Sequence, residues 1–341
     1  MYSDSPSPNI TNPAPLVQWD LPLRLDNLAV SPDHQSLAVL AHQVLYDEGN
    51  STTVLTTIEL NNNIAQSIPD YTQEDAYENF FYGHPARLLG WVDNAEFAIQ
   101  KEGNGAVLAT KSGSYYAALA LPQGGNGIEV ALSSDRKTIF STVVHDKYEW
   151  WLNDLQGGSP QQVANDSSTE LYRPTWSPND KWISFLTPGV YTDTDGLKHI
   201  DFKLMEVWTL DLQTAQQRKL SGAAVWNVEP AWAPDSANLA FLGADDAKNT
   251  NPFYDLPEVT DTNIFIAPVS KVAPPVRLTN FQGVKNSGLQ WITAGTLVLS
   301  SSGGNTDEAR GLVAVRVSDG SVVTLVAGSA TAAITSPYLF K

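Results

Sequence analysis

Cysteine is absent from the 341-residue sequence, and methionine occurs only twice. The lack of cysteine excludes disulfide bonds, thiolate metal sites and cysteine nucleophiles, and it leaves the redox compartment open. No run approaches the roughly 18 apolar residues that a membrane-spanning helix needs. We therefore expect no transmembrane segment.

Basic residues are also few, because 20 Lys and Arg stand against 37 Asp and Glu, for a formal net charge of −17. A charge of this sign and size repels phosphate backbones and anionic lipid headgroups. Nucleic acid and membrane surfaces are thus excluded as expected partners. A cationic segment of a protein or peptide suits such a surface better.

Several catalytic signatures are missing as well. The chain has no Gly-x-Ser-x-Gly nucleophile elbow, no phosphate-binding Gly-x-x-x-x-Gly-Lys loop and no dinucleotide fingerprint. The remaining option for catalysis is metal-assisted or acid–base chemistry. The sequence as a whole favours a protein that is not an enzyme.

Aromatic residues and turn formers, by contrast, are plentiful. The chain contains 10 Trp, 12 Tyr and 11 Phe, and its 23 Gly and 21 Pro are spread along the whole length. This profile is typical of many short strands separated by turns. Because 341 residues exceed the usual size of a single core, the chain needs either two domains or a core divided among repeated units.

The first 15 residues are rich in Ser, Pro and Asn and contain no apolar stretch, so they are not an intact signal peptide. We expect a flexible leader at 1–15. A periplasmic or extracellular location is the preferred interpretation, with an export signal or lipid anchor lost from this chain. A cytoplasmic start is the alternative.

An internal repeat organises the rest of the chain. The segment PTWSPNDKWISF at 174–185 recurs as PAWAPDSANLAF at 230–241, and a third copy, LAVSPD at 28–33, continues into LAVL. Weaker copies without the proline begin at Leu89, Val130 and Leu289. Each copy is a short apolar strand that ends at a Pro- or Asp-containing turn and is followed by an alternating strand.

The spacing of the copies predicts the architecture. The equivalent anchor residues are separated by 41 to 61 residues, and a four-stranded propeller blade needs about 40 to 45. The anchors are Val30, Trp91, Leu132, Trp176, Trp232 and Trp291. We predict an all-β fold, a six-bladed β-propeller of four-stranded antiparallel blades, in which residues 16–341 form a single domain. Its four Trp anchors should be packing residues.

The repeat also resembles that of a known family. The phrase WSPNDKWISF is similar to the repeat of the TolB-type, WD-repeat-like propellers, which also occurs in the propeller domains of prolyl-oligopeptidase-like enzymes and in oligogalacturonate lyases. The resemblance covers about residues 25–327. It implies a fold and no particular activity.

Long, acidic insertions point to one face of this propeller. We expect insertions between the second and third strands of a blade at 42–51, 188–202, 243–262 and 302–310, and a long crossover between blades at 69–86. In a propeller these segments share one face, and long loops on a rigid face are frequent binding sites. The alternative is that they are polar only because surface loops generally are.

Aromatic residues alternate with acids in two of these segments, a combination found on protein and carbohydrate contact surfaces. The alternative is that the aromatic side chains anchor their own loops to the disc. The predicted binding residues are Tyr71, Glu74, Asp75, Tyr77, Phe81, Asp193, Asp195, Asp245, Asp246, Phe253 and Tyr254.

Histidine offers one chemical lead. His42, His84, His145 and His199 all fall in segments expected on this face, where imidazoles of neighbouring blades could hold a divalent metal, as the resemblance to oligogalacturonate lyases suggests. Scattered loop histidines are the simpler interpretation, and we expect no cofactor. The preferred function is a non-catalytic scaffold that binds a protein or peptide through this face or a central channel. A metal-dependent lyase or hydrolase and a carbohydrate-binding module are the alternatives.

Two terminal segments remain outside the repeat. Residues 14–23 and 331–340 contain apolar side chains, including Trp19, Ile334 and Leu339. We expect at least one of the two segments to pair across the first and sixth blades and close the ring.

Overall fold

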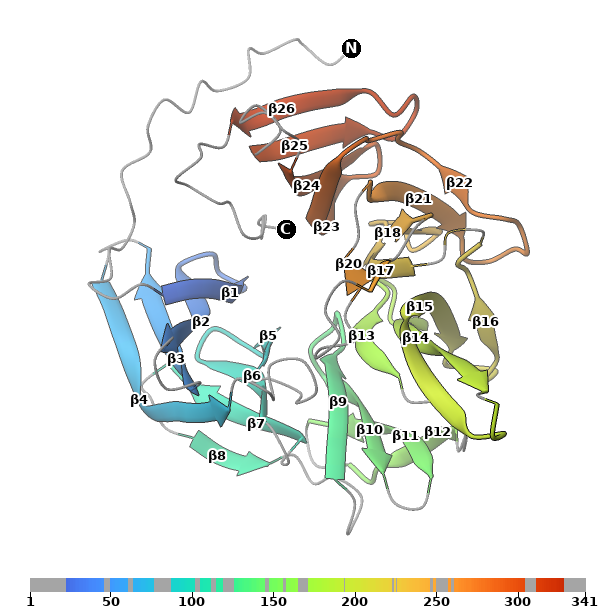
Figure 1. Cartoon of the computed structure of the whole chain (residues 1–341). Helices are drawn as coiled ribbons and strands as arrows, with labels where there is room; N and C mark the ends of the chain where they lie inside the picture. Colours follow the sequence, from blue (N-terminus) through green and yellow to red (C-terminus); the bar gives the residue numbers. More distant parts are fainter. Residues whose placement is uncertain are drawn as a thin grey trace.

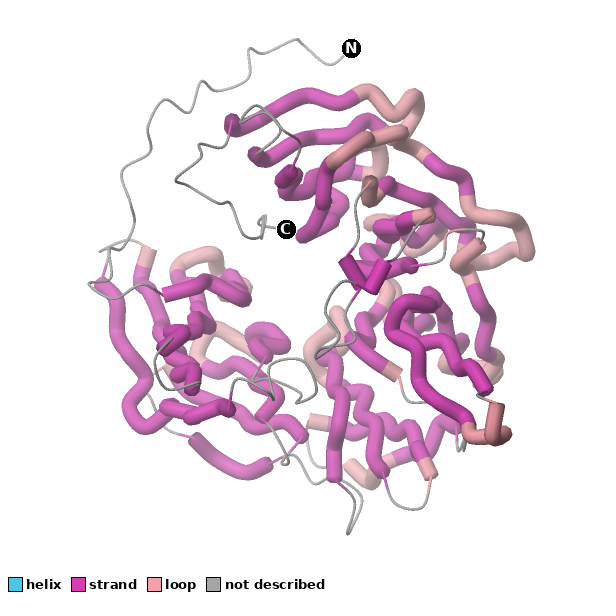
Figure 2. The backbone as a smooth tube through the Cα atoms, in the orientation of Figure 1, coloured by secondary structure: helices cyan, strands magenta, loops and turns pink. Residues whose placement is uncertain are grey.

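The computed structural model is a ring of six four-stranded sheets (Figure 1). All pairings within these sheets are antiparallel, and the described residues contain strands and loops but no helix (Figure 2). The predicted six-bladed all-β propeller is therefore confirmed. The described residues are 23–45, 50–60, 64–76, 87–101, 105–111, 115–118, 126–144, 147–155, 158–164, 171–192, 194–222, 224, 226–245, 248–249, 257–258, 261–303 and 311–327.

Blades 1 to 3 are each formed by four consecutive strands. Their strands are β1 (Leu23–Val30), β2 (Ser36–Leu45), β3 (Asn50–Glu59) and β4 (Ile64–Ala76) in blade 1; β5 (Arg87–Trp91), β6 (Glu96–Lys101), β7 (Gly105–Thr110) and β8 (Tyr115–Ala118) in blade 2; and β9 (Asn126–Leu132), β10 (Thr138–Val144), β11 (Tyr148–Asp154) and β12 (Gln161–Ala164) in blade 3.

Blades 4 to 6 repeat this order, with a small extra hairpin, β19–β20, inserted in blade 5. Their strands are β13 (Tyr172–Trp176), β14 (Trp182–Thr192), β15 (Lys198–Asp211) and β16 (Gln217–Lys219) in blade 4; β17 (Trp226–Trp232), β18 (Asn238–Ala244), β19 (Lys248–Asn249), β20 (Pro257–Glu258), β21 (Asn263–Pro268) and β22 (Val276–Arg277) in blade 5; and β23 (Val284–Thr293), β24 (Thr296–Gly303), β25 (Gly311–Arg316) and β26 (Val322–Ala327) in blade 6.

Every predicted anchor lies at or near the end of the first strand of its blade, and these first strands form the inner edge of the ring (Figure 1). The Trp anchors pack between blades: Trp91, Trp232 and Trp291 are buried, and Trp176 is half-buried. The prediction that they are packing residues is confirmed.

The indoles also bond neighbouring blades to one another. In each case the indole N–H donates to the carbonyl of the residue just before the anchor of the preceding blade. The four bonds are Trp91 to Ala29 (2.9 Å), Trp176 to Ala131 (2.9 Å), Trp232 to Thr175 (3.2 Å) and Trp291 to Ala231 (3.0 Å). The bond from Trp232 to Thr175 shows that the first strands of blades 4 and 5 end side by side. Their second strands therefore run back in the same direction, and the connections from second to third strand in blades 4 and 5 lie on the same face.

The opposite face is formed by the turns that follow the anchors. In three of them a serine hydroxyl donates to an Asp or Asn two residues later, and the turn then passes through a residue with positive φ. Side chains also join successive turns. The amides of Asp33, Ser134 and Asn179 donate to Asn94, Asp180 and Ser236 of the next blade, at 3.1, 2.7 and 3.1 Å.

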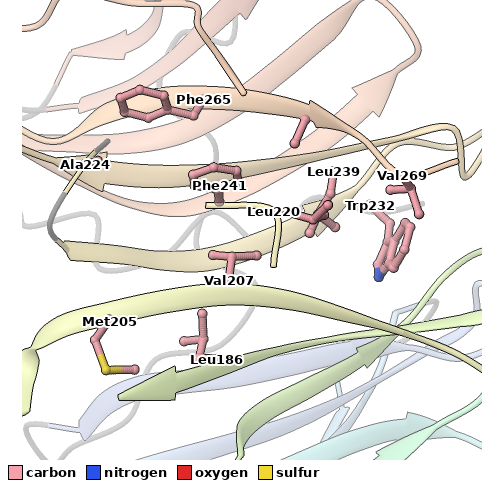
Figure 3. Packing of buried hydrophobic residues seen from close by; sticks show 11 residues of the cluster. Leu186, Met205, Val207, Leu220, Ala224, Trp232, Leu239, Phe241, Phe265 and Val269 are labelled. Atoms are coloured by element: carbon pink, nitrogen blue, oxygen red, sulfur yellow. The ribbon is translucent and has the colours of Figure 1, made fainter. Parts of the chain in front are cut away.

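Most of the described hydrophobic clusters lie between blades rather than inside any one of them. The largest cluster joins blades 4 and 5 and includes Leu186, Val207, Trp232, Leu239 and Phe241 (Figure 3). Separate clusters join blades 1 and 2, 3 and 4, and 5 and 6. Alternation along each strand presents apolar side chains to both neighbouring blades, which is how a repeat without its own core becomes stable.

Blades 1 and 6 each consist of strands from their own part of the chain, so the described strands include none exchanged between them. The segments expected to close the ring, 331–340 and all of 14–23 except Leu23 in β1, lie outside the described residues. Closure by either of them stays a prediction.

Several expected insertions are strands instead. Residues 42–45 belong to β2, where His42 pairs with Thr53, and residues 69–76 belong to β4. Most of 188–202 likewise belongs to β14 and β15, and residues 302–303 belong to β24. The prediction of loops there was wrong because polar residues are compatible with strands that are solvated on one or both faces.

Candidate functional site

The described members of the predicted binding set lie in three blades. Tyr71, Glu74 and Asp75 are on β4, the outermost strand of blade 1, where Glu74 pairs with Thr52 and Asp75 with Ser51. Asp195 and Asp245 lie in blades 4 and 5. The other predicted residues are outside the described part of the chain: Tyr77, Phe81, Asp193, Asp246, Phe253 and Tyr254.

Asp245 follows β18 on the face that carries the connections between second and third strands. Its carboxylate oxygen is 2.9 Å from Nη1 of Arg277, which lies on the outer strand β22. The Asp245 side chain is 65% exposed and the Arg277 side chain 35%, so solvent screens this ion pair and it contributes little to stability. It does reduce the negative charge that Asp245 presents to solvent.

Asp195 lies at the tip of a hairpin that extends beyond blade 4. The pairing of β14 with β13 ends at Leu186, and β16 pairs only with residues 208–210 of β15. The part of β14 and β15 from 188 to 205 therefore pairs with no other described strand. We call residues 188–205 the blade-4 hairpin.

The blade-4 hairpin exposes apolar side chains as well as charge. Val190 is 56% exposed and Leu197 61% exposed, and Asp195, between them in sequence, is also exposed. At the base, Gly189 leaves room for Leu204: a Cβ at position 189 would lie 2.4 Å from the Cβ of Leu204. The glycine thus permits the irregular pairing between Gly189 and Asp201 that sets the hairpin's course.

The four candidate metal ligands are only partly placed. His42 lies on β2 in blade 1 and His199 on β15 in blade 4, and His84 and His145 are outside the described residues. In the described part of the chain, no three His, Asp or Glu side chains come together in a way that could hold a metal ion.

A second arrangement of charges lies on the inner edge of the ring. The first strands of blades 4, 5 and 6 have a bulge three residues before the Trp anchor, and the residue there has positive φ: Arg173 (50°), Glu229 (51°) and Gly288 (66°). Glycine adopts this conformation freely. For Arg173 and Glu229 it is strained, the more so because each precedes a proline.

Glu229 connects the three bulges. One oxygen of its carboxylate accepts the N–H of Leu289 at 3.2 Å, and the N–H of Gly288 also donates to the carboxylate. Burial raises the pKa of Glu229, while Arg173 and the two N–H groups lower it by a smaller amount. Arg173 itself is exposed. We call Arg173, Glu229 and Gly288 the inner-rim bulges.

Sequence reasoning missed the inner-rim bulges, although a signal was present. Once the Trp anchors are aligned, Arg173 and Glu229 fall at the same position of the two strongest repeat copies, each followed by Pro. Charge at one fixed position of a buried-strand repeat is unusual. What the alignment could not show was the bulge, which depends on pairing with the second strand.

One pocket lies on the turn face, opposite the blade-4 hairpin. It has a volume of about 390 Å³ and is lined by Asp180, Lys181, Trp182, Asp211, Leu212 and Gln213. The Asp180 carboxylate already accepts the amides of Ser134 and Asp135. The pocket therefore follows from the contacts between turns, and its main acidic group has a structural role.

No helix of the described chain has the length and hydropathy of a transmembrane span. No family model matches the sequence, and no curated protein matches it.

Solved structures share the fold at low sequence identity. An oligogalacturonate lyase in complex with manganese has a TM-score of 0.59 at 14% identity, with 88% of this chain and 76% of that chain covered. The β-propeller domain of the Trilobed protease from Pyrococcus furiosus has a TM-score of 0.51 at 9% identity, covering 90% and 84%. A putative TolB from Agrobacterium tumefaciens is also among the similar structures, with a TM-score of 0.47 at 14% identity, covering 80% and 89%. The likeness to the first two of these structures shows a β-propeller fold.

Proposed function

We propose that this chain is a non-catalytic propeller scaffold that binds a protein or peptide segment on the face carrying the blade-4 hairpin. The observation that supports this most directly is the exposure of Val190 and Leu197 beside Asp195. Exposed apolar groups next to charge are characteristic of protein contact surfaces.

The preferred partner segment is cationic. The chain carries a net charge of −17, and the sequence 188–205 contains three Asp against two Lys, so the charge of the whole chain is the main support for this preference. A field of this sign accelerates the approach of a positively charged segment and fades as salt shortens the Debye length to about 8 Å at physiological ionic strength. A periplasmic or extracellular setting is part of the same proposal.

An array of random decapeptides of cationic, neutral and anionic composition tests the proposal. We expect the protein to bind cationic peptides preferentially at low salt and to release them as salt rises. The double substitution Val190→Ser and Leu197→Ser should weaken this binding about tenfold, since each removes an apolar contact.

The matched control is the pair Val322→Ser and Val323→Ser on β26, whose side chains are 44% and 57% exposed on the outer edge of blade 6. This variant should bind as the unmodified protein does. Equal losses in both variants, or no preference for cationic peptides, would contradict the proposal.

A further inference from the structure

The inner-rim bulges hold two strained, oppositely charged residues that the fold does not require to be charged. Blade 6 makes the same bulge with Gly288, the residue that this backbone conformation favours. Non-glycine residues at positive φ cost of order 1 kcal/mol or more and persist where the surroundings or a function demand them. Arg173 and Glu229 are therefore candidates for a binding role.

The two charges differ in how they are held. The Glu229 carboxylate is fixed by two backbone N–H groups of blade 6 and is largely surrounded by protein. Arg173 is exposed, and it lies on β13, one of the first strands that line the centre of the ring (Figure 1). The flanks of a first strand pack against neighbouring blades, so an exposed side chain at its bulge faces the central space.

We propose that Arg173 binds a carboxylate group of a peptide ligand entering the centre of the ring, and that this carboxylate replaces Glu229 as the main counter-charge of the guanidinium. Arginine suits this role because its planar guanidinium offers paired N–H donors to a carboxylate. Glu229 is a positioning residue: its negative charge holds the guanidinium near the rim when no ligand is present.

The proposal predicts that substitutions of Arg173 and Glu229 change the affinity for a carboxylate ligand in opposite directions. Loss of the Arg173 charge removes the binding group. Loss of the Glu229 charge removes a competing anion and leaves the guanidinium to the ligand. A merely structural role for Glu229 would instead predict that its substitution weakens binding. The identification of the ligand as a peptide rests on the proposed function, whereas the carboxylate site can be tested without it.

The test uses small probes rather than the unidentified partner. Acetyl-glycylglycine carries a terminal carboxylate, acetyl-aspartate amide carries a side-chain carboxylate, and acetyl-glycylglycine amide carries none. Each is titrated while the Arg173 side-chain N–H signal is followed by NMR, with the signal assigned by its loss in Arg173→Gln. We expect saturable shifts with one or both carboxylates and none with the amide; the stronger of the two acids identifies a chain end or an acidic side chain as the source.

Variants complete the test. Arg173→Gln should weaken the carboxylate affinity about tenfold or more, and Arg173→Lys should retain part of it. Glu229→Gln should strengthen it several-fold. Arg277→Gln, on the outer strand of blade 5, is the matched control and should change nothing.

Three results would overturn the inference: equal shifts with the amide probe, no shift of the Arg173 signal with either acid, or weaker binding in Glu229→Gln with an unchanged near-ultraviolet dichroism spectrum. A failure of the peptide array with a positive probe titration would reject the proposed peptide scaffold and leave the carboxylate site standing. The reverse pattern would reject the site alone.

Discussion

The seam between blades 4 and 5 and the flank of blade 1 that faces away from blade 2 have the same strand pattern but very different cores. The seam contains large side chains from both blades, among them Leu186 and Met205 of blade 4 and Trp232, Phe241 and Phe265 of blade 5 (Figure 3). The described cluster on the blade-1 flank consists of Leu37, Val39 and Ile58, all from blade 1. The described apolar core is therefore larger at the seam between blades 4 and 5 than on this flank of blade 1.

The backbone contacts show the same inequality. Blade 5 donates an indole hydrogen bond to blade 4 through Trp232, whereas the anchor of blade 1 is Val30, which has no side-chain donor. The junction where the chain begins and ends thus lacks a bond that four other junctions have. Stability in a repeat protein is the sum of such junction terms, so we expect unfolding to begin at blade 1.

The largest expected effect comes from a matched pair of core truncations. Leu239 and Leu37 are both buried on second strands, at 0% and 4% exposure. Leu239→Ala should lower the free energy of unfolding by about 2–5 kcal/mol, toward the upper end, because the surrounding rings cannot close the cavity. For Leu37→Ala the loss should lie toward the lower end of this range, because the described cluster around Leu37 is smaller.

Urea denaturation followed by circular dichroism measures both values. Val323→Ala, at an exposed position, should be close to neutral and serves as the control. Equal losses at Leu239 and Leu37 would show that the blade-1 flank is packed as firmly as the seam.

A smaller effect is expected from the indole bond. Trp232→Phe keeps an aromatic ring but removes the N–H that bonds to Thr175, and it leaves that carbonyl without its partner. The expected loss is about 1–3 kcal/mol. Trp151→Phe is the matched control, because the Trp151 indole bonds to Glu149 within a single strand. A loss at Trp151 as large as that at Trp232 would mean that the interblade bond has no special weight.

The sequence predicted the repeating part of this molecule well and the variable part poorly. The anchors and the strands that follow them were found because a turn such as Ser177 to Asp180 has its own chemistry, fixed by residues close in sequence. The blade-4 hairpin was expected as a long, acidic loop between the second and third strands of its blade. In the structure, Gly189 makes room for Leu204 and the pairing continues.

The inner-rim bulges show a second kind of feature that the sequence alone did not predict. The charge of Arg173 acts on Glu229 because two first strands bulge at the same position, and that position is set by pairing with the second strands. Local sequence carries the charges but not their common position in the ring. For the predicted binding residues Glu74 and Asp75 the opposite holds: the sequence shows their charge, but it did not indicate the strand that contains them.

The smallest expected effect concerns the carboxylates of Glu229 and Asp33, whose contributions to the free energy of unfolding should change with pH in opposite directions. Burial raises the pKa of Glu229, so between its unfolded-state and folded-state values the folded protein binds more protons than the unfolded chain. The stability that Glu229 contributes is then complete below the unfolded-state pKa and is lost as pH rises through the folded-state pKa. Asp33, on the turn face of blade 1, behaves in the reverse sense. The Ser31 hydroxyl, followed by the Gln35 amide, lowers its pKa, so its contribution is present above the unfolded-state value and is lost as pH falls through the folded-state value.

Measuring the free energy of unfolding against pH in Glu229→Gln and Asp33→Asn tests this difference. Glu229→Gln should remove a decline in stability toward neutral pH, because the amide is uncharged at every pH. Asp33→Asn should remove part of the decline toward acid and leave the neutral side unchanged. If Glu229→Gln altered only the acid side, the Glu229 carboxylate would be stabilised in its charged form by Arg173 and the blade-6 amides, and the electrostatic balance at the inner rim would have the opposite sign.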